Sequence, residues 1–329
     1  MNQSEFLAQW NTDKTMFRAW GTEVVDTVRT ALRSEHPEIS LDVFLRIDPK
    51  PRIKEDGSLI TKAFYRNKQY SDPYHDIEDK VGVRFVVLLR KDIEVIRSIV
   101  ATESRWQASE DRNFLEEQAK DPYSFSYSAF HYVVRSSFTH AYNLDGNDVN
   151  IIVGTPCEIQ IKTLLQHAYS ELTHDTIYKP KIQASPDIRR SSAKSMALLE
   201  AADDYFSIVQ HGIDSEVQKE RDVLSTLQSL YSSIIGREGT TNDSDVQIVS
   251  AYLHHLPDQW QENLGLLIKD DESIISVIQN VGETYPLVNH PSILLVIYLA
   301  KRRRDTAKNY WPFTPTLLED AIHPFGISV

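Results

Sequence analysis

The sequence predicts an α/β protein with a mixed β-sheet of about five strands, flanked by helices and followed by a helical C-terminal region. Helical periodicity separates several of the expected strands, for example over 92–103, which is typical of α/β folds. The strands are expected where β-branched or aromatic runs are bounded by turn residues, at 41–47, 81–89, 130–136, 150–153 and 158–163.

Three longer helical patterns complete the expected architecture. Apolar residues recur every three or four positions over 6–34, which predicts an amphipathic helix covering the sheet. A second helical pattern follows over 162–179. A third is opened by Pro186 and runs to about residue 233, with an interruption expected near Gly212.

The domain organisation follows from a change in composition after these helices. Glycine, threonine and aspartate are frequent in the segment 236–245, which has no apolar period and is typical of an exposed linker. We therefore expect a first domain over 1–235 and a helical region over 246–329.

Composition and charge limit the kind of protein this is. The 329 residues are 41% hydrophobic and 25% charged, which is ordinary for a globular protein and excludes collagen-like or wholly disordered chains. The net charge of -12 repels nucleic acid on average, so a local cluster of Lys and Arg is informative. A single cysteine, Cys157, excludes an internal disulfide. Without a signal-like N-terminus or a membrane-length apolar run, we expect a cytoplasmic protein.

The first candidate cluster is cationic. If a helix begins at Ser58, a residue type that caps helices, then Ser58, Lys62 and Arg66 lie on one face. Arg52 and Lys54 precede that helix on the incoming chain. Four cations and a helix N-terminus would then converge on one anion such as a triphosphate. A solvated basic face is the alternative.

The second and third clusters supply carboxylates. Asp79 stands just ahead of a buried strand, which suits Mg²⁺ binding or, alternatively, a capping or turn aspartate. Arg84 interrupts that strand and should be paired or face a cleft. Strict alternation places Glu158, Gln160 and Lys162 on one face of another strand. Glu158 could supply the second carboxylate for metal-assisted phosphoryl transfer, although this face could simply meet water.

Aromatic residues precede the strand expected at 130–136. Tyr127 and His131 share parity, so one ring could stack on a nucleobase while the other meets a phosphate or ribose. For Phe125 and Phe130 we expect places in the hydrophobic core.

A polar stripe follows on the helix expected over 162–179. His167, Glu171, His174 and Tyr178 are spaced to lie on one helical face. A zinc site is one interpretation, but HxxxExxH differs from the zinc-binding HExxH arrangement. Hydrogen bonding from this helix to the site is the preferred interpretation.

Taken together, these motifs resemble the synthetase domain of the RelA/SpoT family, whose enzymes make the alarmones pppGpp and ppGpp. The resemblance extends over roughly residues 15–210. It is carried by RxKxxxSxxxK from Arg52, DxxGxR from Asp79, YxxxH from Tyr127, and EIQIKT from Glu158 followed by QHAYSELTHDTIYK.

The resemblance implies a nucleotidyltransferase-like synthetase fold and a short, single-function enzyme. That enzyme would transfer the β,γ-pyrophosphate of ATP to the 3′-hydroxyl of GDP or GTP. The carboxylates of Asp79 and Glu158 would be catalytic and would bind Mg²⁺. The residues implied to bind ATP are Arg52, Lys54, Ser58, Lys62 and Arg84. The residues implied to bind the acceptor are Tyr127, His131, Gln160, Lys162 and His167.

Two departures from the family pattern leave the acceptor open. The loop before His131 lacks the lysine and glycine of a Lys-Pro-Asn-Gly-Tyr-like segment, and Lys162 replaces an arginine and its bidentate geometry. The alternatives are a toxin-like relative that modifies adenosine nucleotides or the 3′ end of tRNA, and a non-catalytic nucleotide-sensing module. No counterpart of the family's hydrolase domain precedes the strands, so we expect no hydrolase activity.

The C-terminal region is where we expect partners other than nucleotides to bind. Apolar helical patterning over 246–329 fits a homo-oligomer interface or a surface for an antitoxin or regulatory protein. The basic run 301–304 fits tRNA binding or, more simply, a solvated helix end.

Overall fold

The computed structural model describes residues 1–66, 70–123, 125, 129–173, 185–236, 239, 241–281 and 285–328. The chain divides into two compact units, Met1–Ile208 and Val209–Val329. Each unit has a hydrophobic core of its own. Within the described ranges, no helix combines the length and the apolar character needed to cross a bilayer.

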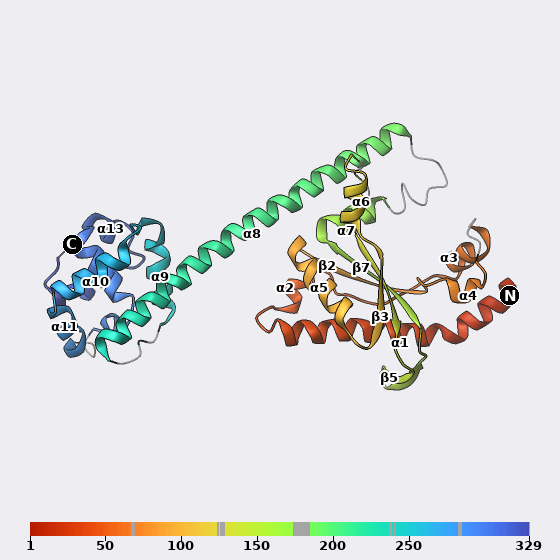
Figure 1. The fold of residues 1–329 in the computed structure, drawn as a ribbon, viewed down its shortest axis with the longest axis horizontal. Coiled ribbons are helices and arrows are strands. Elements are labelled where there is room, and N and C mark those ends of the chain that lie inside the picture. The colour runs from red at the N-terminus through yellow and green to blue at the C-terminus, as the bar shows by residue number, and fades with distance from the viewer. Residues whose placement is uncertain are drawn as a thin grey trace. The chain divides into compact units, whose positions relative to one another are not determined.

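Unit 1 contains the sheet. Its elements, in chain order, are α1 (Gln3–Glu35), α2 (Leu41–Phe44), β1 (Arg52–Ile53), α3 (Asp56–Ile60), the π-helical turn η1 (Thr61–Tyr65), α4 (Pro73–Asp76), β2 (Val81–Val87), α5 (Arg90–Thr102), β3 (Trp106–Arg112), α6 (Phe114–Lys120), β4 (Phe130–Ser136), β5 (His140–Leu144), β6 (Asn147–Ile151), β7 (Pro156–Thr163) and α7 (Leu164–Thr173). Helix α8 (Pro186–Ile235) begins in unit 1 and ends in unit 2 (Figure 1).

The main sheet has five strands in the order β1-β2-β7-β4-β3. Strands β2 and β7 are parallel, and the other neighbouring pairs are antiparallel. The expected mixed five-stranded sheet flanked by helices is therefore confirmed. Strands β5 and β6 form a separate hairpin sheet.

The strands differ from the expectation in several places, and β1 and β5 are two strands that were not expected. The run 41–47 is mostly helical, and only Ile47 pairs with the sheet, in an isolated bridge to Val86. The run 150–153 contributes its first residues to β6, outside the main sheet. Strand β3 was not expected, because Trp106 is its only buried residue and pairing with β4 holds it in place.

Helix α1 confirms the amphipathic helix expected over 6–34 and packs across one face of the sheet (Figure 1). Its fully buried side chains include Phe6, Trp10 and Trp20. The Trp20 ring meets Trp106 of β3 edge-on, with centroids 6.1 Å apart. Helix α5 contacts both α1 and β7, so the two helices cover the same face.

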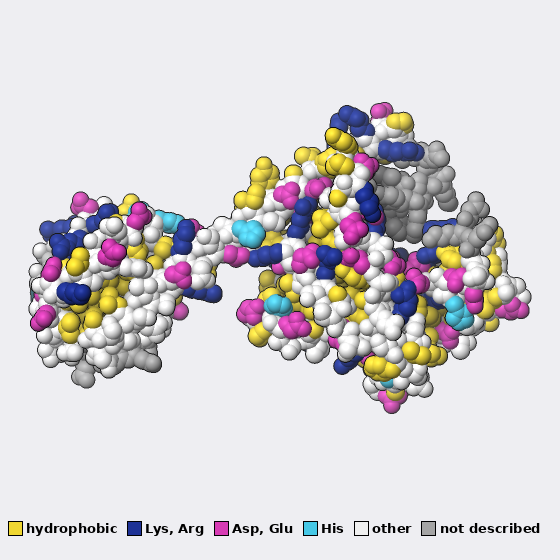
Figure 2. All heavy atoms as spheres, in the orientation of Figure 1, with side chains coloured by type: hydrophobic (Ala, Val, Ile, Leu, Met, Phe, Trp, Pro, Cys, Tyr) yellow, Lys and Arg dark blue, Asp and Glu magenta, His cyan; other side chains and the backbone are white. Residues whose placement is uncertain are grey.

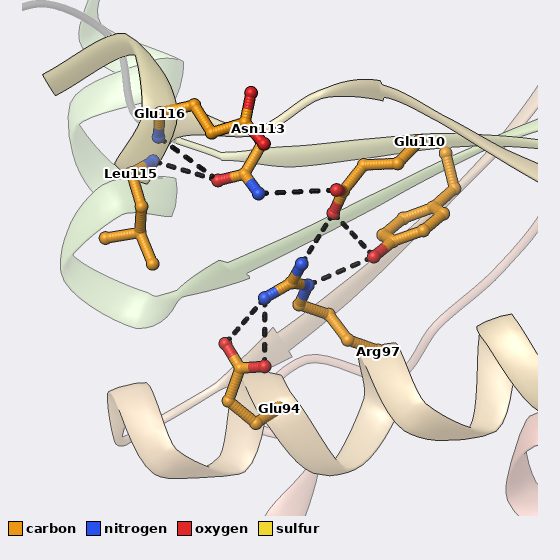
Figure 3. Close-up of polar contacts among 7 residues, drawn as sticks. Glu94, Arg97, Glu110, Asn113, Leu115 and Glu116 are labelled. Carbon is orange, nitrogen blue, oxygen red and sulfur yellow. Dashed lines mark hydrogen bonds and ion pairs between the residues drawn. The ribbon is translucent and has the colours of Figure 1, made fainter. Parts of the chain in front are cut away.

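A polar network attaches the edge strand β3 to the rest of unit 1 (Figure 3). Arg97 on α5 donates to the Tyr132 hydroxyl at 3.0 Å and to Glu110 of β3 at 2.7 Å. The same guanidinium pairs with Glu94 at 2.8 Å and lies 3.9 Å from the Phe130 ring centroid. These bonds compensate for the small apolar surface that β3 buries.

Unit 2 is helical, which confirms the expected helical C-terminal region. Helix α8 contributes Val223, Leu227 and Tyr231 to its core. The other elements are α9 (Asp243–Tyr252), η3 (Leu253–His255), α10 (Trp260–Asp270), α11 (Ser273–Val281), η4 (Pro286–Asn289), α12 (Ile293–Arg302), α13 (Arg304–Asn309), α14 (Pro315–Ile322) and η5 (His323–Phe325). The domain limits expected from the sequence stay a prediction.

The expected interruption near Gly212 is wrong. Helix α8 begins at Pro186 as expected and continues without a break to Ile235. A glycine in an exposed helix costs only about 1 kcal/mol relative to alanine, which a long helix tolerates.

Gly21 marks a close approach between α1 and the sheet. A Cβ at this position would lie 2.7 Å from the Pro51 Cβ and 2.7 Å from the Val81 Cγ2. Gly21→Ala should therefore lower the free energy of unfolding by about 1–3 kcal/mol, because the backbones must move apart. Denaturant unfolding followed by tryptophan fluorescence measures this change.

Gly57→Ala is the matched control for that substitution. Gly57 is helical, in α3, and a Cβ there would meet nothing within 4 Å. We expect no loss of stability, or a gain of up to about 1 kcal/mol from better helix propensity. Equal destabilisation by both substitutions would contradict the close packing at Gly21.

Candidate functional site

A cavity of about 550 Å³ lies at β2 and β7, bordered by the segment around 47–66 and by α7. It opens on the face that carries the polar side chains of β7, whereas Ile159 and Ile161 point into the core with α1 and α5. The candidate residues that line it are Arg52, Lys54, Ser58, Asp79, Arg84, Glu158, Gln160 and His167.

Strand register explains why residues distant in the sequence meet here. In the parallel pair, Gly82 of β2 lies opposite Glu158 of β7, and Arg84 lies opposite Gln160. On the other side of β7, His131 of β4 also lies opposite Gln160. Residues that are directly opposite in a sheet share a face, so these side chains gather on the cavity side.

Asp79 lies just ahead of β2 between two ammonium groups. Its Oδ2 is 2.5 Å from Lys54 Nζ and 2.8 Å from Lys62 Nζ. Burial alone would raise the pKa of this carboxyl, but Lys54 and Lys62 together hold the pKa below its ordinary value. Its Oδ1 is buried and has no hydrogen-bond partner among the residues that the structure describes. Asp79 is therefore an ionised carboxylate whose Oδ1 accepts no hydrogen bond from the part of the chain that the structure describes.

The helix that presents the cations begins earlier than expected. Helix α3 starts at Asp56 with Glu55 as its N-cap, so the expectation that Ser58 caps this helix is wrong. The helix continues as the π-helical turn η1, in which the Arg66 N–H donates to Thr61 O at 3.0 Å. The wider turn still brings the residues together, because Ser58 and Arg66 line the cavity and Lys62 reaches Asp79.

Glu158 is held by two neighbours. Its Oε1 is 3.2 Å from His131 Nδ1, and its Oε2 accepts from Gln160 Nε2 at 3.1 Å. Burial opposes ionisation, but the contact with His131 outweighs it and lowers the pKa of this carboxyl below its ordinary value. The second carboxylate is therefore also charged near neutral pH.

Lys162 lies behind Gln160 and is 1% exposed. Its Nζ donates to Gln160 Oε1 at 3.1 Å and to Ser170 Oγ at 3.3 Å. Burial, and secondly the charge of Arg84, lower the pKa of this ammonium group to about 7. The third polar residue of β7 thus contacts the cavity through Gln160.

Helix α7 closes one side of the cavity with two residues of the expected polar stripe. Glu171 accepts from Arg84 at 2.6 Å, which confirms that Arg84 is both paired and facing a cavity. The pKa of His167 is lowered by burial and by the nearby charge of Lys162. Lys50 also lines the cavity and was assigned no role from the sequence. A signal for Lys50 was its place beside the other cations of this segment.

Several expectations concern residues that the structure does not describe or places elsewhere. Tyr127, His174 and Tyr178 lie outside the described residues. Phe130 is in the core as expected, whereas Phe125 is 41% exposed, so its expected burial is wrong. Where the chain is described, no group of three or more His, Cys, Asp or Glu residues is placed to hold a metal ion.

The basic run at 301–304 coincides with a helix end. Helix α12 ends at Arg302, where cations interact favourably with the helix dipole, and Lys301 pairs with Asp271. Over the face drawn in Figure 2, Lys and Arg side chains are interspersed with Asp and Glu. These contacts fit a solvated helix end, and tRNA binding by this run stays a prediction.

Comparison with known proteins identifies the region that holds the site. Residues 51–183 match the family model described as a region found in RelA / SpoT proteins. The chain therefore carries a RelA/SpoT region, and all the candidate residues from Arg52 to His167 fall within it. A comparison with the curated proteins found no match.

Among solved structures, the chain is similar to a GTP pyrophosphokinase family protein from Streptococcus pneumoniae. The two share 17% identity with a TM-score of 0.50, over 63% of this chain and 95% of that one. Small alarmone synthetase 1 from Bacillus subtilis matches at 15% identity with a TM-score of 0.48, over 63% of this chain and 99% of that one. The same synthetase bound to its product pppGpp matches at 16% identity with a TM-score of 0.47, over the same shares. At these identities the likeness concerns the fold alone.

Buried Lys162 should make the stability depend on pH. The pKa is about 7 in the folded chain, against an ordinary value of 10.5. Between these values the unfolded chain binds a proton that the folded chain has lost, so stability should rise with pH. Lys162→Met should reduce that rise, measured as melting temperature from about pH 7 to about pH 9.

Lys80 serves as the internal reference for this measurement. It is also buried, and burial lowers its pKa to about 8, so it contributes a rise of the same sign in both proteins. The slope should therefore decrease in Lys162→Met without vanishing. An unchanged slope would show that Lys162 titrates normally in the folded chain.

Proposed function

We propose that the chain is an ATP-dependent nucleotide pyrophosphokinase that transfers the β,γ-pyrophosphate of ATP to the 3′-hydroxyl of GDP or GTP. The main support is one cavity, inside a RelA/SpoT region, that combines a cluster of cations with two ionised carboxylates. Its volume of about 550 Å³ is in the range of small-molecule sites.

The ATP phosphates would bind on the side of the cavity lined by Arg52 and Lys54, with Lys62 close by at Asp79. A triphosphate is a strong polyanion, and charge-assisted hydrogen bonds from Lys and Arg are the usual means of holding it. Ser58 lines the same wall and can donate from its hydroxyl.

The residues of this cavity fit Mg²⁺. The buried Asp79 Oδ1 has no partner among the described residues, and Glu158 is ionised nearby. Mg²⁺ is commonly held by one or two carboxylates together with phosphate oxygens. Bound by Asp79 and Glu158, it would neutralise negative charge on the phosphates.

The proposed reaction is an in-line displacement at the β-phosphorus of ATP. The 3′-oxygen of the acceptor forms the new bond to phosphorus, the bond to the α-phosphate oxygen breaks, and AMP leaves. The hydroxyl proton passes to Glu158, which its lowered pKa keeps ionised. Positioning and charge neutralisation supply most of the rate in such transfers.

The acceptor would lie beside Glu158, where His131 and His167 would contact its phosphates. Adenosine nucleotides and the 3′ end of tRNA are the other acceptors to test. A nucleotide-sensing module without catalysis is the remaining alternative, but two carboxylates beside bound phosphates have no evident use in such a module.

An acceptor screen tests the reaction directly. With ATP and Mg²⁺, we expect AMP to form only when GDP or GTP is added, together with a product heavier by one pyrophosphate in mass spectrometry. If only an adenosine nucleotide or only tRNA receives the pyrophosphate, that molecule is the acceptor in place of GDP and GTP. Absence of transfer to every acceptor would contradict the proposed function.

Glu158→Gln tests the assigned carboxylate. We expect turnover to fall at least roughly 100-fold, because the amide cannot accept the proton, with ATP affinity retained. Steady-state kinetics and calorimetric ATP binding separate the two effects. Glu116→Gln, on the exposed face of α6, is the matched control and should retain activity. Full activity in Glu158→Gln would contradict the role of Glu158 as proton acceptor, although the proposal that the chain transfers pyrophosphate would remain.

A further inference from the structure

The cavity face of β7 carries three polar residues, of which one is hidden. Glu158 and Gln160 reach the cavity, whereas Lys162 is 1% exposed. A buried ammonium group is costly unless it is hydrogen-bonded, so the bonds that Lys162 makes are strongly constrained.

The directions of those bonds follow from donor and acceptor chemistry. In its charged form, the Lys162 amino group only donates hydrogen bonds. Ser170 gives its own hydroxyl proton to His167 O at 2.8 Å, so its Oγ is able to accept from Lys162 Nζ at 3.3 Å. Lys162 also donates to Gln160, and the atom it contacts there must be the carbonyl oxygen Oε1.

This contact determines the orientation of the Gln160 amide. With Oε1 towards Lys162, the amide nitrogen Nε2 faces Glu158 and donates to Oε2 at 3.1 Å. A flipped amide would place its NH₂ group against an ammonium and its carbonyl against a carboxylate. Both contacts of the flipped form are repulsive, so Lys162 selects one of the two amide orientations.

Strand β2, which lies beside Glu158, has no side chain at the opposite position to hold the Glu158 carboxylate in place. Gly82 lies across from it, and the position that a Cβ would take at residue 82 is 3.7 Å from Glu158 Oε2. The carboxylate is therefore oriented by Gln160 at one oxygen and by His131 at the other.

We propose that Lys162 is a positioning residue that fixes the Gln160 amide, and through it the Glu158 carboxylate, for pyrophosphate transfer. This role rests on the proposed function of Glu158. Lys162 acts through Gln160, so its removal should affect turnover more than ATP binding.

Substitution at Lys162 gives the first test. Lys162→Met keeps most of the length of the side chain but removes the donors, and kcat should fall roughly 10- to 100-fold because the reacting groups are misplaced. The KM for ATP should stay within about threefold of the original value. Lys162→Arg keeps donor groups facing Gln160 and should restore most of the activity. Melting temperatures identify any variant that fails to fold.

A double-mutant cycle gives the second test. If Lys162 acts through Gln160, then Lys162→Met and Gln160→Met combined should lower kcat no further than the more damaging single change. Additive losses, a loss carried by the KM for ATP, or full activity of Lys162→Met would overturn the proposal.

A measurement independent of activity separates this inference from the proposed function. The Gln160 side-chain amide can be observed by NMR in protein labelled at glutamine nitrogen and assigned with Gln160→Met. Its Nε2 protons should show the shift and slow exchange of a bond to a carboxylate, and Lys162→Met should remove both. Unchanged amide signals would overturn the positioning role. If Lys162→Met changes the Gln160 amide signals in a protein that transfers no pyrophosphate, then Lys162 positions Gln160 as proposed and the proposed reaction is wrong.

Discussion

Strands β2 and β7 run parallel and side by side, with Gly82 opposite Glu158, and this register brings the candidate site together. A slip of one residue would turn Glu158 and Gln160 into the core under α1 and α5. Burial of Ile159 and Ile161 opposes that slip, because both side chains are fully enclosed on the helix-covered face. The apolar half of β7 thus determines where the polar half points.

Opposite charges are paired around the cavity. Asp79 lies between Lys54 and Lys62, and Arg84 is paired with Glu171. In the proposed reaction, the phosphates of ATP would compete with Asp79 Oδ2 for Lys54 and Lys62, and Asp79 and Glu158 would hold Mg²⁺. Substrate and metal would then stabilise each other's binding through an exchange of ion pairs.

Sequence patterns anticipated the elements whose periodicity is strong and whose burial is one-sided. Helix α1 and the alternation along β7 are the clearest cases. Strand β3 could not be recognised, because its charged, exposed residues form a strand only by pairing with β4, far along the chain. Residues 41–47 show the reverse problem, since a short apolar run suits a strand or a helix and tertiary packing decides between them.

The candidate site was predictable as a set of residue types but not as a set of contacts. The cations and carboxylates follow from the motifs, whereas the pairing of Glu171 with Arg84 joins positions 87 residues apart and depends on the fold. The same holds for the contact of Gln160 with Lys162, which needs side-chain geometry that alternation alone does not supply. The capping role of Ser58 was misassigned because the N-cap is Glu55, three residues earlier.

The wide turn η1 has a consequence for insertions and deletions in this segment. Thr61–Tyr65 accommodates more residues per turn than a regular α-helix, and Lys62 points at Asp79 from within it. Removal of one residue ahead of Lys62 would preserve a helix while rotating the ammonium group by about 100° around the axis. Chain length between the cations is therefore constrained as tightly as their chemical identity, and homologous segments of different length would need another lysine to occupy the same place.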